Sequence, residues 1–502
     1  MSKAETDLSD RAPSADLRRT AISGTAFIAV SQICKITLQF ATLLVVSRLL
    51  KPDDFGVVAM VMPIVGILPL LQDFGLQQAL IQAHSVSEAQ VNRIFWVNVA
   101  IAITTGAVLV AAAPFVARFY GEPRVEPLLA LWATPVMLTS IGIHHVGLLN
   151  RHLRFRAIAM IEIAVSFGTS IAAIAGAFLF ANYWAMLAST TAGAVLMVLL
   201  AWNATRWVPG SPVLSAQIGH LIRFGAELTG SDVLRYLSRN VGNVIIATVF
   251  GATKLGLFDL SYKLVLLPIS HVNGPIGRVL QPLLGRIRNE PERYQRGYLL
   301  VASATIWTIA PAVGALAFTT PEFIDVVLGD QWHGAGPALF WLSVAGLCNP
   351  LVHTTIWLFV TQHRTRDLLR WSLLSSAMTI LSFVAGLPWG LPGVAAGYAL
   401  NIVLLQTPIL FAFVGRRGPV SARDLWSIQA PVFVAAALTF GLSIAGKAHL
   451  GMPAIVWIAS VALTSYVVLG AVLLCTTTGR ERLRALAAIG AASFSNLARS
   501  WQ

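Results

Sequence analysis

Residues 157–180 read AIAMIEIAVSFGTSIAAIAGAFLF, an unbroken apolar stretch whose single charge is Glu162. A helix that crosses the hydrocarbon core of a bilayer needs about 20 mainly apolar residues. The stretch is long enough, and it lacks the alternation of polar and apolar residues that marks a membrane β-strand. It therefore predicts a transmembrane helix.

The rest of the chain follows the same pattern. Hydrophobic residues make up 56% of the 502 residues and charged residues 11%, against roughly 25% charged residues in an ordinary soluble domain. This composition excludes a soluble enzyme, a disordered scaffold and a protein with a single membrane anchor. We expect an all-α, polytopic membrane protein with about 14 transmembrane helices. The apolar runs lie near residues 21–46, 55–80, 91–113, 125–149, 157–180, 183–202, 218–249, 255–281, 298–318, 334–360, 368–388, 391–413, 426–446 and 452–475.

The positive charge follows the predicted topology. Residues 1–20 are polar and are predicted to form a flexible cytoplasmic head, and an even number of spans returns the C-terminus to the cytoplasm. Most of the 35 Lys and Arg residues then fall in cytoplasmic segments, as the positive-inside rule requires. The net charge of +13 is therefore topological, and we expect no nucleic-acid partner.

The tail and the cysteines add little about function. Residues 479–502 mix Arg with Leu, Ile, Phe and Trp, which fits either a basic helix on the cytoplasmic leaflet or a frayed tail. Cys34, Cys348 and Cys475 lie in apolar stretches without paired spacing. This pattern favours buried small residues over a disulfide framework or a zinc site, and no metal or cofactor is expected.

A shift of 200 residues relates two parts of the chain. It superposes residues 48–56 on residues 248–256 and Lys35 on Arg235. Each repeat would hold six spans, an even number, so both halves would enter the membrane from the same side and enclose a central cavity. The predicted parts are two pseudo-symmetric six-helix lobes, two extra helices and the basic tail, at residues 21–207, 218–414, 426–475 and 479–502.

Four motifs in order point to a known family. They are Leu50-Lys-Pro-Asp-Asp-Phe-Gly56, Asp73-Phe-Gly-Leu-Gln-Gln-Ala-Leu-Ile-Gln82, Arg118-Phe-Tyr-Gly121 and Leu149-Asn-Arg-His-Leu-Arg-Phe155. With them the chain resembles bacterial polysaccharide exporters, the Wzx-type lipid-linked oligosaccharide flippases of the MOP (multidrug/oligosaccharidyl-lipid/polysaccharide) superfamily.

The resemblance implies a function and a location. It implies a bacterial inner-membrane protein that moves an undecaprenyl-diphosphate-linked repeat unit from the cytoplasmic to the periplasmic leaflet. The product would serve capsule, exopolysaccharide or O-antigen (lipopolysaccharide) synthesis. We expect the protein to act as a monomer among inner-membrane lipids, with a polysaccharide polymerase and chain-length machinery as partners.

Ionisable side chains at membrane depth are costly, and they are therefore candidates for function. The predicted substrate-binding cations, which would hold the diphosphate through their N–H donors, are Lys35, Arg235, Arg239 and Lys263. The alternative is that these cations form internal ion pairs: Asp232 with Arg235 or Arg239, and Asp259 with Lys263. The spacing of four residues in the second pair places both side chains on one helix face.

The acidic residues have open roles. Glu227, Asp232 and Asp259 are predicted either to carry a coupling cation or proton, since buried carboxylates titrate upward, or to serve as ion-pair partners. Asp73 and Glu162 lie towards cytoplasmic helix ends, where gating pairs with inner-loop arginines and plain solvation are both open. The four histidines within apolar runs are predicted to pack between helices rather than to bind metal; they are His144, His145, His271 and His353.

Other classes of function lack their motifs. Gly225-Ala-Glu-Leu-Thr-Gly-Ser231 is the nearest string to a Walker A loop, but it has no Lys and lies in a span. A cation-coupled drug or metabolite exporter of the same superfamily would favour acidic cavity residues. A membrane glycosyl-chain polymerase or ligase would need a sizeable outer loop, whereas the longest one, near 319–333, has no Lys or Arg. The cationic set and the short loops favour a flippase, which is not an enzyme.

Overall fold

The computed structural model describes residues 32, 34–69, 88–151, 154–211 and 219–500. Within these residues the regular elements are helices, and none is a strand. The chain is thus an all-α polytopic membrane protein, as the sequence predicts. Contacts divide it into two compact units, one of Met1–Leu50 and Val61–Leu237, the other of Lys51–Met60 and Ser238–Gln502. The predicted part boundaries stay predictions.

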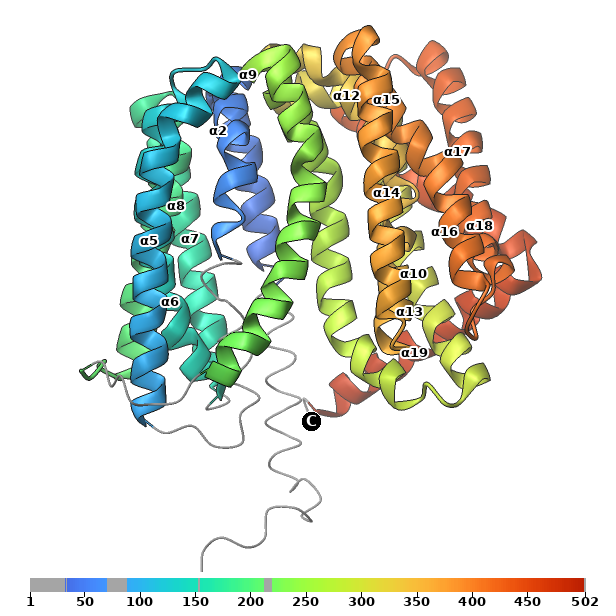
Figure 1. Cartoon of the computed structure of the whole chain (residues 1–502). Helices are drawn as coiled ribbons and strands as arrows, with labels where there is room; N and C mark the ends of the chain where they lie inside the picture. The colour runs from blue at the N-terminus through green and yellow to red at the C-terminus, as the bar shows by residue number, and fades with distance from the viewer. Residues whose placement is uncertain (1–31, 33, 70–87, 152–153, 212–218, 501–502) are drawn as a thin grey trace, which may run out of the picture. The chain divides into compact units, whose positions relative to one another are not determined.

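The first unit is built on long helices that run side by side (Figure 1). Residues 34–49 are helical. The four helices that follow in this unit are α5 (Glu88–Tyr120), α6 (Val125–Arg151), α7 (Phe155–Phe180) and α8 (Trp184–Thr205). α7 and α8 pack closely, because a Cβ on Gly193 would lie 2.3 Å from Cγ2 of Thr169. Small residues let helix backbones approach in this way inside a bilayer.

The helices α2 and α9 contain residues that the shift of 200 relates to each other. α2 spans Pro52–Val65, and α9 spans Gly219–Arg286. The backbone of α9 leaves helical geometry at Gly251, with φ 76° and ψ −174°. The break at Gly251 lies between the spans predicted at 218–249 and 255–281, so α9 consists of two helices, one on each side of that glycine. Only glycine adopts that backbone conformation readily.

The second unit contains the remaining helices. Their bounds are α10 (Pro291–Phe318), α11 (Thr320–Phe323), α12 (Gly336–Gly346), α13 (Asn349–Thr361), α14 (Thr365–Gly386), α15 (Gly390–Leu400), α16 (Thr407–Gly415), α17 (Ala422–Leu450), α18 (Ala454–Cys475) and α19 (Thr477–Ser500). A π-helical turn Ile324–Leu328 and a 3-10 turn Asp330–Ala335 connect α11 to α12. Buried tyrosines of α10 bond to α13: Oη of Tyr294 lies 2.6 Å from Oγ1 of Thr361.

Two predicted spans are broken in the structure. The predicted span 334–360 consists of a segment Asp330–Gly346 and a segment Asn349–Thr361 bent by 43°. Nε2 of the buried Gln429 donates to the freed carbonyl of Leu347 at 3.2 Å, which satisfies that carbonyl where hydrocarbon offers no water. The predicted span 391–413 is likewise α15 and α16 joined by a π-helical segment, Asn401–Gln406.

The helices are long and apolar enough to cross a membrane. Among the described residues nine helices meet that test, or ten if the bent pair is one span. The number fourteen is consistent with this result and stays a prediction. Phe115, Phe178 and Leu179 are large apolar side chains that lie exposed on helix surfaces. Such apolar surface suits hydrocarbon rather than water, so the protein is a multi-pass membrane protein.

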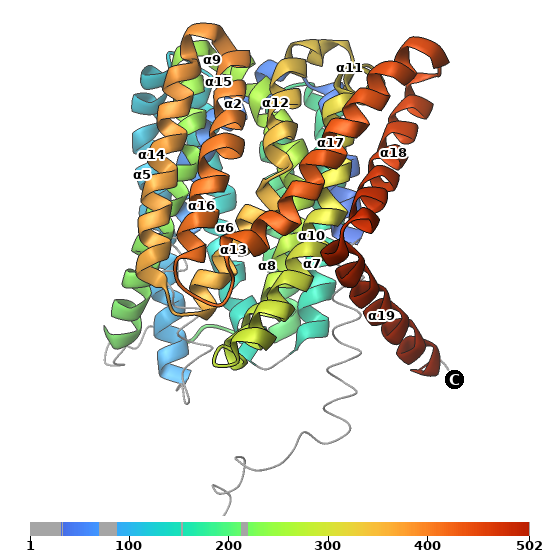
Figure 2. The ribbon, with the colours of Figure 1, turned by 90° about the vertical axis from the view of Figure 1, so that its right-hand side faces the viewer.

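The basic tail is a helix. Figure 2 shows α17 beside α18, and α19 leading away from the end of α18. Leu483 and Leu486 are partly buried against the core of the second unit. Arg482 donates to Oγ of Ser427 at 3.1 Å, and burial lowers the pKa of its guanidinium while the charge of Asp424 opposes that shift. The structure favours the helix over the frayed tail, while its position on a leaflet stays a prediction.

Trp332 offers a test of the packing in the second unit. Its ring is fully buried and lies edge-on to Phe55, with 5.2 Å between ring centroids. We expect Trp332→Ala to lower the free energy of unfolding by about 3–5 kcal/mol, because it leaves a cavity. Thermal unfolding in detergent measures the effect. Trp389→Ala is the matched control, since Trp389 is 73% exposed; equal losses in both variants would contradict the packing.

Candidate functional site

An ion pair joins two predicted spans of the first unit. Nζ of Lys35 lies 2.5 Å from Oε2 of Glu162. Lys35 lies in the helix of residues 34–49, and Glu162 lies in the second turn of α7. The Lys35 side chain is 15% exposed and that of Glu162 is 50% exposed. The partner of Lys35 thus comes from another span, and Glu162 has Lys35 as an ion-pair partner.

A second ion pair lies within α9 in the second unit. Nζ of Lys263 is 2.6 Å from Oδ2 of Asp259, one helical turn earlier. The Asp259 side chain is 7% exposed and that of Lys263 is 40% exposed. The pair matches the internal ion pair that the sequence left open as an alternative. Lys263 is thus the more exposed member of the pair, and Asp259 is the buried one.

Aromatic rings surround this part of α9. Phe258 and Tyr262 stack at 6.2 Å, and Phe383 of α14 stacks on Tyr398 of α15 at 5.7 Å. Tyr262 meets Tyr398 edge-on at 6.4 Å. Phe258 and Phe383 are buried, whereas the two tyrosines are partly exposed. The same two turns of α9 therefore carry the ion pair and two rings of an aromatic cluster.

Several predicted site residues cannot be placed. The backbone of Glu227, Asp232, Arg235 and Arg239 is helical within α9, but their side chains lie outside the described residues. Asp73 lies outside the described residues altogether. The repeat-equivalent pair of Lys35 and Arg235 thus stays a prediction, as does the whole set of substrate-binding cations.

The first unit contains a cluster of histidine and aromatic side chains that the sequence does not predict as a group. His144 and His145 pack among Phe95 and Trp207, with ring centroids 5.2–6.4 Å apart. Nδ1 of His145 lies 2.8 Å from Oγ1 of Thr205. The two histidines pack between helices, as their apolar context predicts. No group of three His, Cys, Asp or Glu among the described residues could hold a metal ion.

The same cluster fixes the segment after α8. Nε1 of Trp96 donates to the carbonyl of Gly210 at 2.8 Å, and the amide of Gly210 donates to Oδ1 of Asn92 at 3.0 Å. Asn92 and Trp96 lie in the first turns of α5, more than a hundred residues earlier. Sequence reasoning missed these contacts because neither residue belongs to a recognisable motif.

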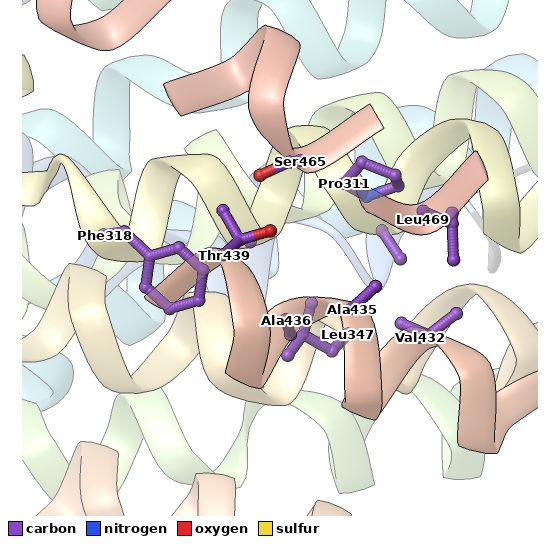
Figure 3. Close-up of a pocket in the computed structure, with 11 residues that line it drawn as sticks. Pro311, Phe318, Leu347, Val432, Ala435, Ala436, Thr439, Ser465 and Leu469 are labelled. Carbon is purple, nitrogen blue, oxygen red and sulfur yellow. The ribbon is translucent and has the colours of Figure 1, made fainter. Parts of the chain in front are cut away.

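The hollows found in the second unit do not suit a charged ligand. Figure 3 shows a cavity between α10, α17 and α18 with Thr439 and Ser465 on its wall. Its volume of about 10 Å³ holds one water at most. A groove of about 790 Å³ runs along α17 and α18, lined mainly by apolar side chains such as Val434, Leu438 and Val468. Such a groove accepts a hydrocarbon chain but offers no cation to a phosphate.

Residues 45–337 match the family described as polysaccharide biosynthesis protein. The match covers more than half of the chain. The chain belongs to this family. Its membership accords with the Wzx-type resemblance of the four motifs and with a place in the MOP superfamily.

Individual relatives agree with the family. The chain is 24% identical over 392 residues to the lipopolysaccharide biosynthesis protein WzxC of Escherichia coli (strain K12), covering 78% of this chain and 79% of that one. It is 28% identical over 317 residues to the succinoglycan biosynthesis transport protein ExoT of Rhizobium meliloti (strain 1021), covering 62% and 64%. These relatives are biosynthesis and transport proteins rather than enzymes by name.

Solved structures share the fold. The lipid II flippase MurJ in an inward closed conformation aligns with a TM-score of 0.68 at 11% identity, over 90% of this chain and 98% of that one. An inward-facing multidrug resistance MATE family transporter of the MOP superfamily aligns with a TM-score of 0.60 at 15% identity, over 80% and 99%. Identities this low show the fold alone.

The pair in α9 generates a prediction about stability. Lys263→Met leaves the buried Asp259 carboxylate without its ion-pair partner, so we expect the free energy of unfolding to fall by about 1–3 kcal/mol. The double variant Asp259→Asn, Lys263→Met should recover most of that loss, because it removes the orphaned charge. Thermal unfolding in detergent at pH 7 compares the two. Equal losses in both variants would contradict the pair.

Proposed function

We propose that this protein is an inner-membrane flippase for an undecaprenyl-diphosphate-linked oligosaccharide repeat unit, which it moves from the cytoplasmic to the periplasmic leaflet. Membership of the polysaccharide biosynthesis family is the observation that carries the proposal. The names of the similar proteins WzxC and ExoT, which refer to lipopolysaccharide biosynthesis and succinoglycan transport, support the substrate class. Both termini would lie in the cytoplasm.

The substrate's diphosphate would be held by cations. In this proposal Lys35, Arg235, Arg239 and Lys263 are the binding residues. An ammonium group has three N–H donors, so Lys35 can keep Glu162 on one donor and offer the others to phosphate. Lys263 resembles it, because its carboxylate partner is buried and its own side chain is 40% exposed. Each cation would thus be stabilised by a carboxylate until the substrate arrives.

The carboxylates would then have a second role. When phosphate oxygens compete for Lys35, Glu162 loses part of its electrostatic partner, and the same holds for Asp259 beside Lys263. We propose that Asp259, with Glu227 and Asp232, couples transport to a cation or proton, and that Glu162 and Asp73 respond during gating.

The non-ionic parts of the substrate need different surfaces. Tyr262 and Tyr398, which meet edge-on and are partly exposed, would offer hydroxyl groups and ring faces to sugars. The apolar groove along α17 and α18 suits the polyprenyl chain, since burying a hydrocarbon chain requires no polar partner. A polymerase and chain-length proteins would receive the product, and the transporter itself would act as a monomer.

A deletion strain tests the function. We expect loss of the gene to cause lipid-linked oligosaccharide to accumulate in the cytoplasmic leaflet, where an enzyme or lectin added from outside cannot reach it. The same strain should stop making the polysaccharide, and re-expression should restore it. Unchanged polysaccharide together with lost resistance to cationic drugs would instead favour the cation-coupled exporter of the same superfamily.

Neutralising both repeat-equivalent cations tests the binding site. We expect Lys35→Gln with Arg235→Gln to abolish polysaccharide export in the deletion strain, because both charge-assisted contacts to the diphosphate are lost. Polysaccharide yield and the amount of protein in the membrane are measured together. Arg296→Gln is the matched control, since that side chain is 77% exposed at a helix surface.

Glu162→Gln separates binding from packing. If Lys35 served only to neutralise Glu162, this variant would restore export to the Lys35→Gln protein. The proposal expects no restoration, because the amide removes the orphaned charge but brings no cation for the phosphate. Full export by the Lys35→Gln, Arg235→Gln protein would remove the phosphate-binding role.

A further inference from the structure

The first two turns of α19 have two faces of different chemistry. At about 100° per residue, Arg480 and Arg484 lie about 40° apart around the helix, and Arg482 lies about 160° from each of them. Their burial follows the same division, because Arg480 and Arg484 are exposed while Arg482 is partly buried. The helix therefore has an inner face around Arg482 and an outer face that carries the other two arginines.

The inner face is attached to two other helices. Nη2 of Arg482 donates to Oγ of Ser427 in α17 at 3.1 Å, and Nη1 donates to Oγ of Ser303 in α10 at 3.5 Å. Leu483 and Leu486 are partly buried against the core of the second unit. Polar and apolar contacts together thus hold α19 against the second unit.

A carboxylate balances the charge of the inner arginine. Asp424 in the first turn of α17 acts electrostatically on Arg482. Oδ2 of Asp424 also accepts a hydrogen bond from Nε2 of Gln295 in α10 at 2.7 Å. Arg482 therefore has its counter-ion within the protein, and its role is to hold the helix in place.

A tight junction determines where α19 begins. The 22 residues of α18 rise about 33 Å, which matches a hydrocarbon core of about 30 Å. The next residue, Thr476, has an extended backbone, and its Oγ1 accepts from the amide of Gly479 at 3.2 Å. A Cβ on Gly479 would lie 2.3 Å from the carbonyl oxygen of Leu473, so the first turn of α19 packs directly on the last turn of α18. α19 therefore starts at the depth of the lipid headgroups, and Figure 2 shows it turning away from the axis of α18.

The outer face presents cations without a protein anion. Within the described part of the chain, neither Arg480 nor Arg484 forms an ion pair. Glu481 is the one carboxylate in these two turns, and its charge acts on Arg482. Guanidinium groups bind phosphate through paired N–H donors. Two of them on one helix face at headgroup depth match the phosphates of the bilayer in charge and in position.

We propose that the outer face of α19 binds anionic phospholipid headgroups, with Arg480 and Arg484 as the contacts and Arg482 as the residue that positions the helix. Basic residues beside a membrane gain free energy from anionic lipids in this way. The surface is separate from the proposed substrate-binding cations, and the inference requires only that α18 crosses the membrane. The predicted topology places this surface at the cytoplasmic leaflet.

A lipid titration of the full-length protein tests the surface. The protein in detergent is mixed with phosphatidylglycerol or with phosphatidylcholine, and thermal unfolding is measured. A ligand that binds the folded state raises the unfolding temperature, so phosphatidylglycerol should raise it more than phosphatidylcholine does. Arg480→Gln with Arg484→Gln should weaken phosphatidylglycerol binding about 10- to 30-fold and leave the unfolding temperature in phosphatidylcholine unchanged.

A matched control removes the same charge elsewhere. Arg366 and Arg370 are also exposed and four residues apart, at the start of α14, but Arg370 lies 3.9 Å from Asp367. Arg366→Gln with Arg370→Gln should keep the response to phosphatidylglycerol. The same loss in this control, or an equal effect of both lipids on the unchanged protein, overturns the proposal, and the second result leaves the outer face to an acidic protein partner.

Two further measurements separate the faces and the source of the phosphate. Arg482→Gln should lower the unfolding temperature even in phosphatidylcholine, because Asp424 loses its cation, whereas a loss confined to phosphatidylglycerol contradicts the positioning role. Soluble glycerol phosphate should not replace the lipid, and equal stabilisation by it overturns binding to a membrane surface. None of these measurements involves transport, so their outcome does not depend on the flippase assignment.

Discussion

A polar group inside hydrocarbon must find its partner within the protein, because no water is there to hydrate it. This constraint explains why the described elements are helical and why two charged pairs form within the described spans. Lys35 reaches Glu162 across two helices, and Asp259 reaches Lys263 along one. It also explains why the side chain of Gln429 donates a hydrogen bond to the carbonyl of Leu347, at the break between α12 and α13. Under the proposed function, a charged substrate would compete with these existing partners.

The sequence predicts the helices well and their interruptions poorly. Apolar runs show where the chain can cross a membrane, since hydropathy is a local property. A break changes the backbone but not the hydropathy. The bend after Gly346 and the π-helical segment from Asn401 each lie within a single apolar run, so hydropathy does not predict them.

The candidate site shows the same limit. The spacing of Asp259 and Lys263 predicts a pair on one helix face, since four residues make about one turn. Lys35 and Glu162 are 127 residues apart, and no local pattern connects them. The shift of 200 residues aligns Gly56 with Gly256, but equivalence in a repeat does not reveal contact. That contact depends on where the local axis runs, which is a property of the folded helices.

In the second unit Gly56 lies against the carbonyl of Ala252 and Gly256 lies against the carbonyl of Pro52, and this reciprocal contact has a consequence for ancestry. A surface in which residue 52 meets the equivalent of 56, and 56 meets the equivalent of 52, is isologous, the form that two identical subunits adopt in a symmetric dimer. A half-length precursor with this proline, aspartate and glycine would have dimerised through the same atoms. Fusion of two such genes would preserve the interface while freeing each copy to diverge, as Asp53 and Thr253 have done.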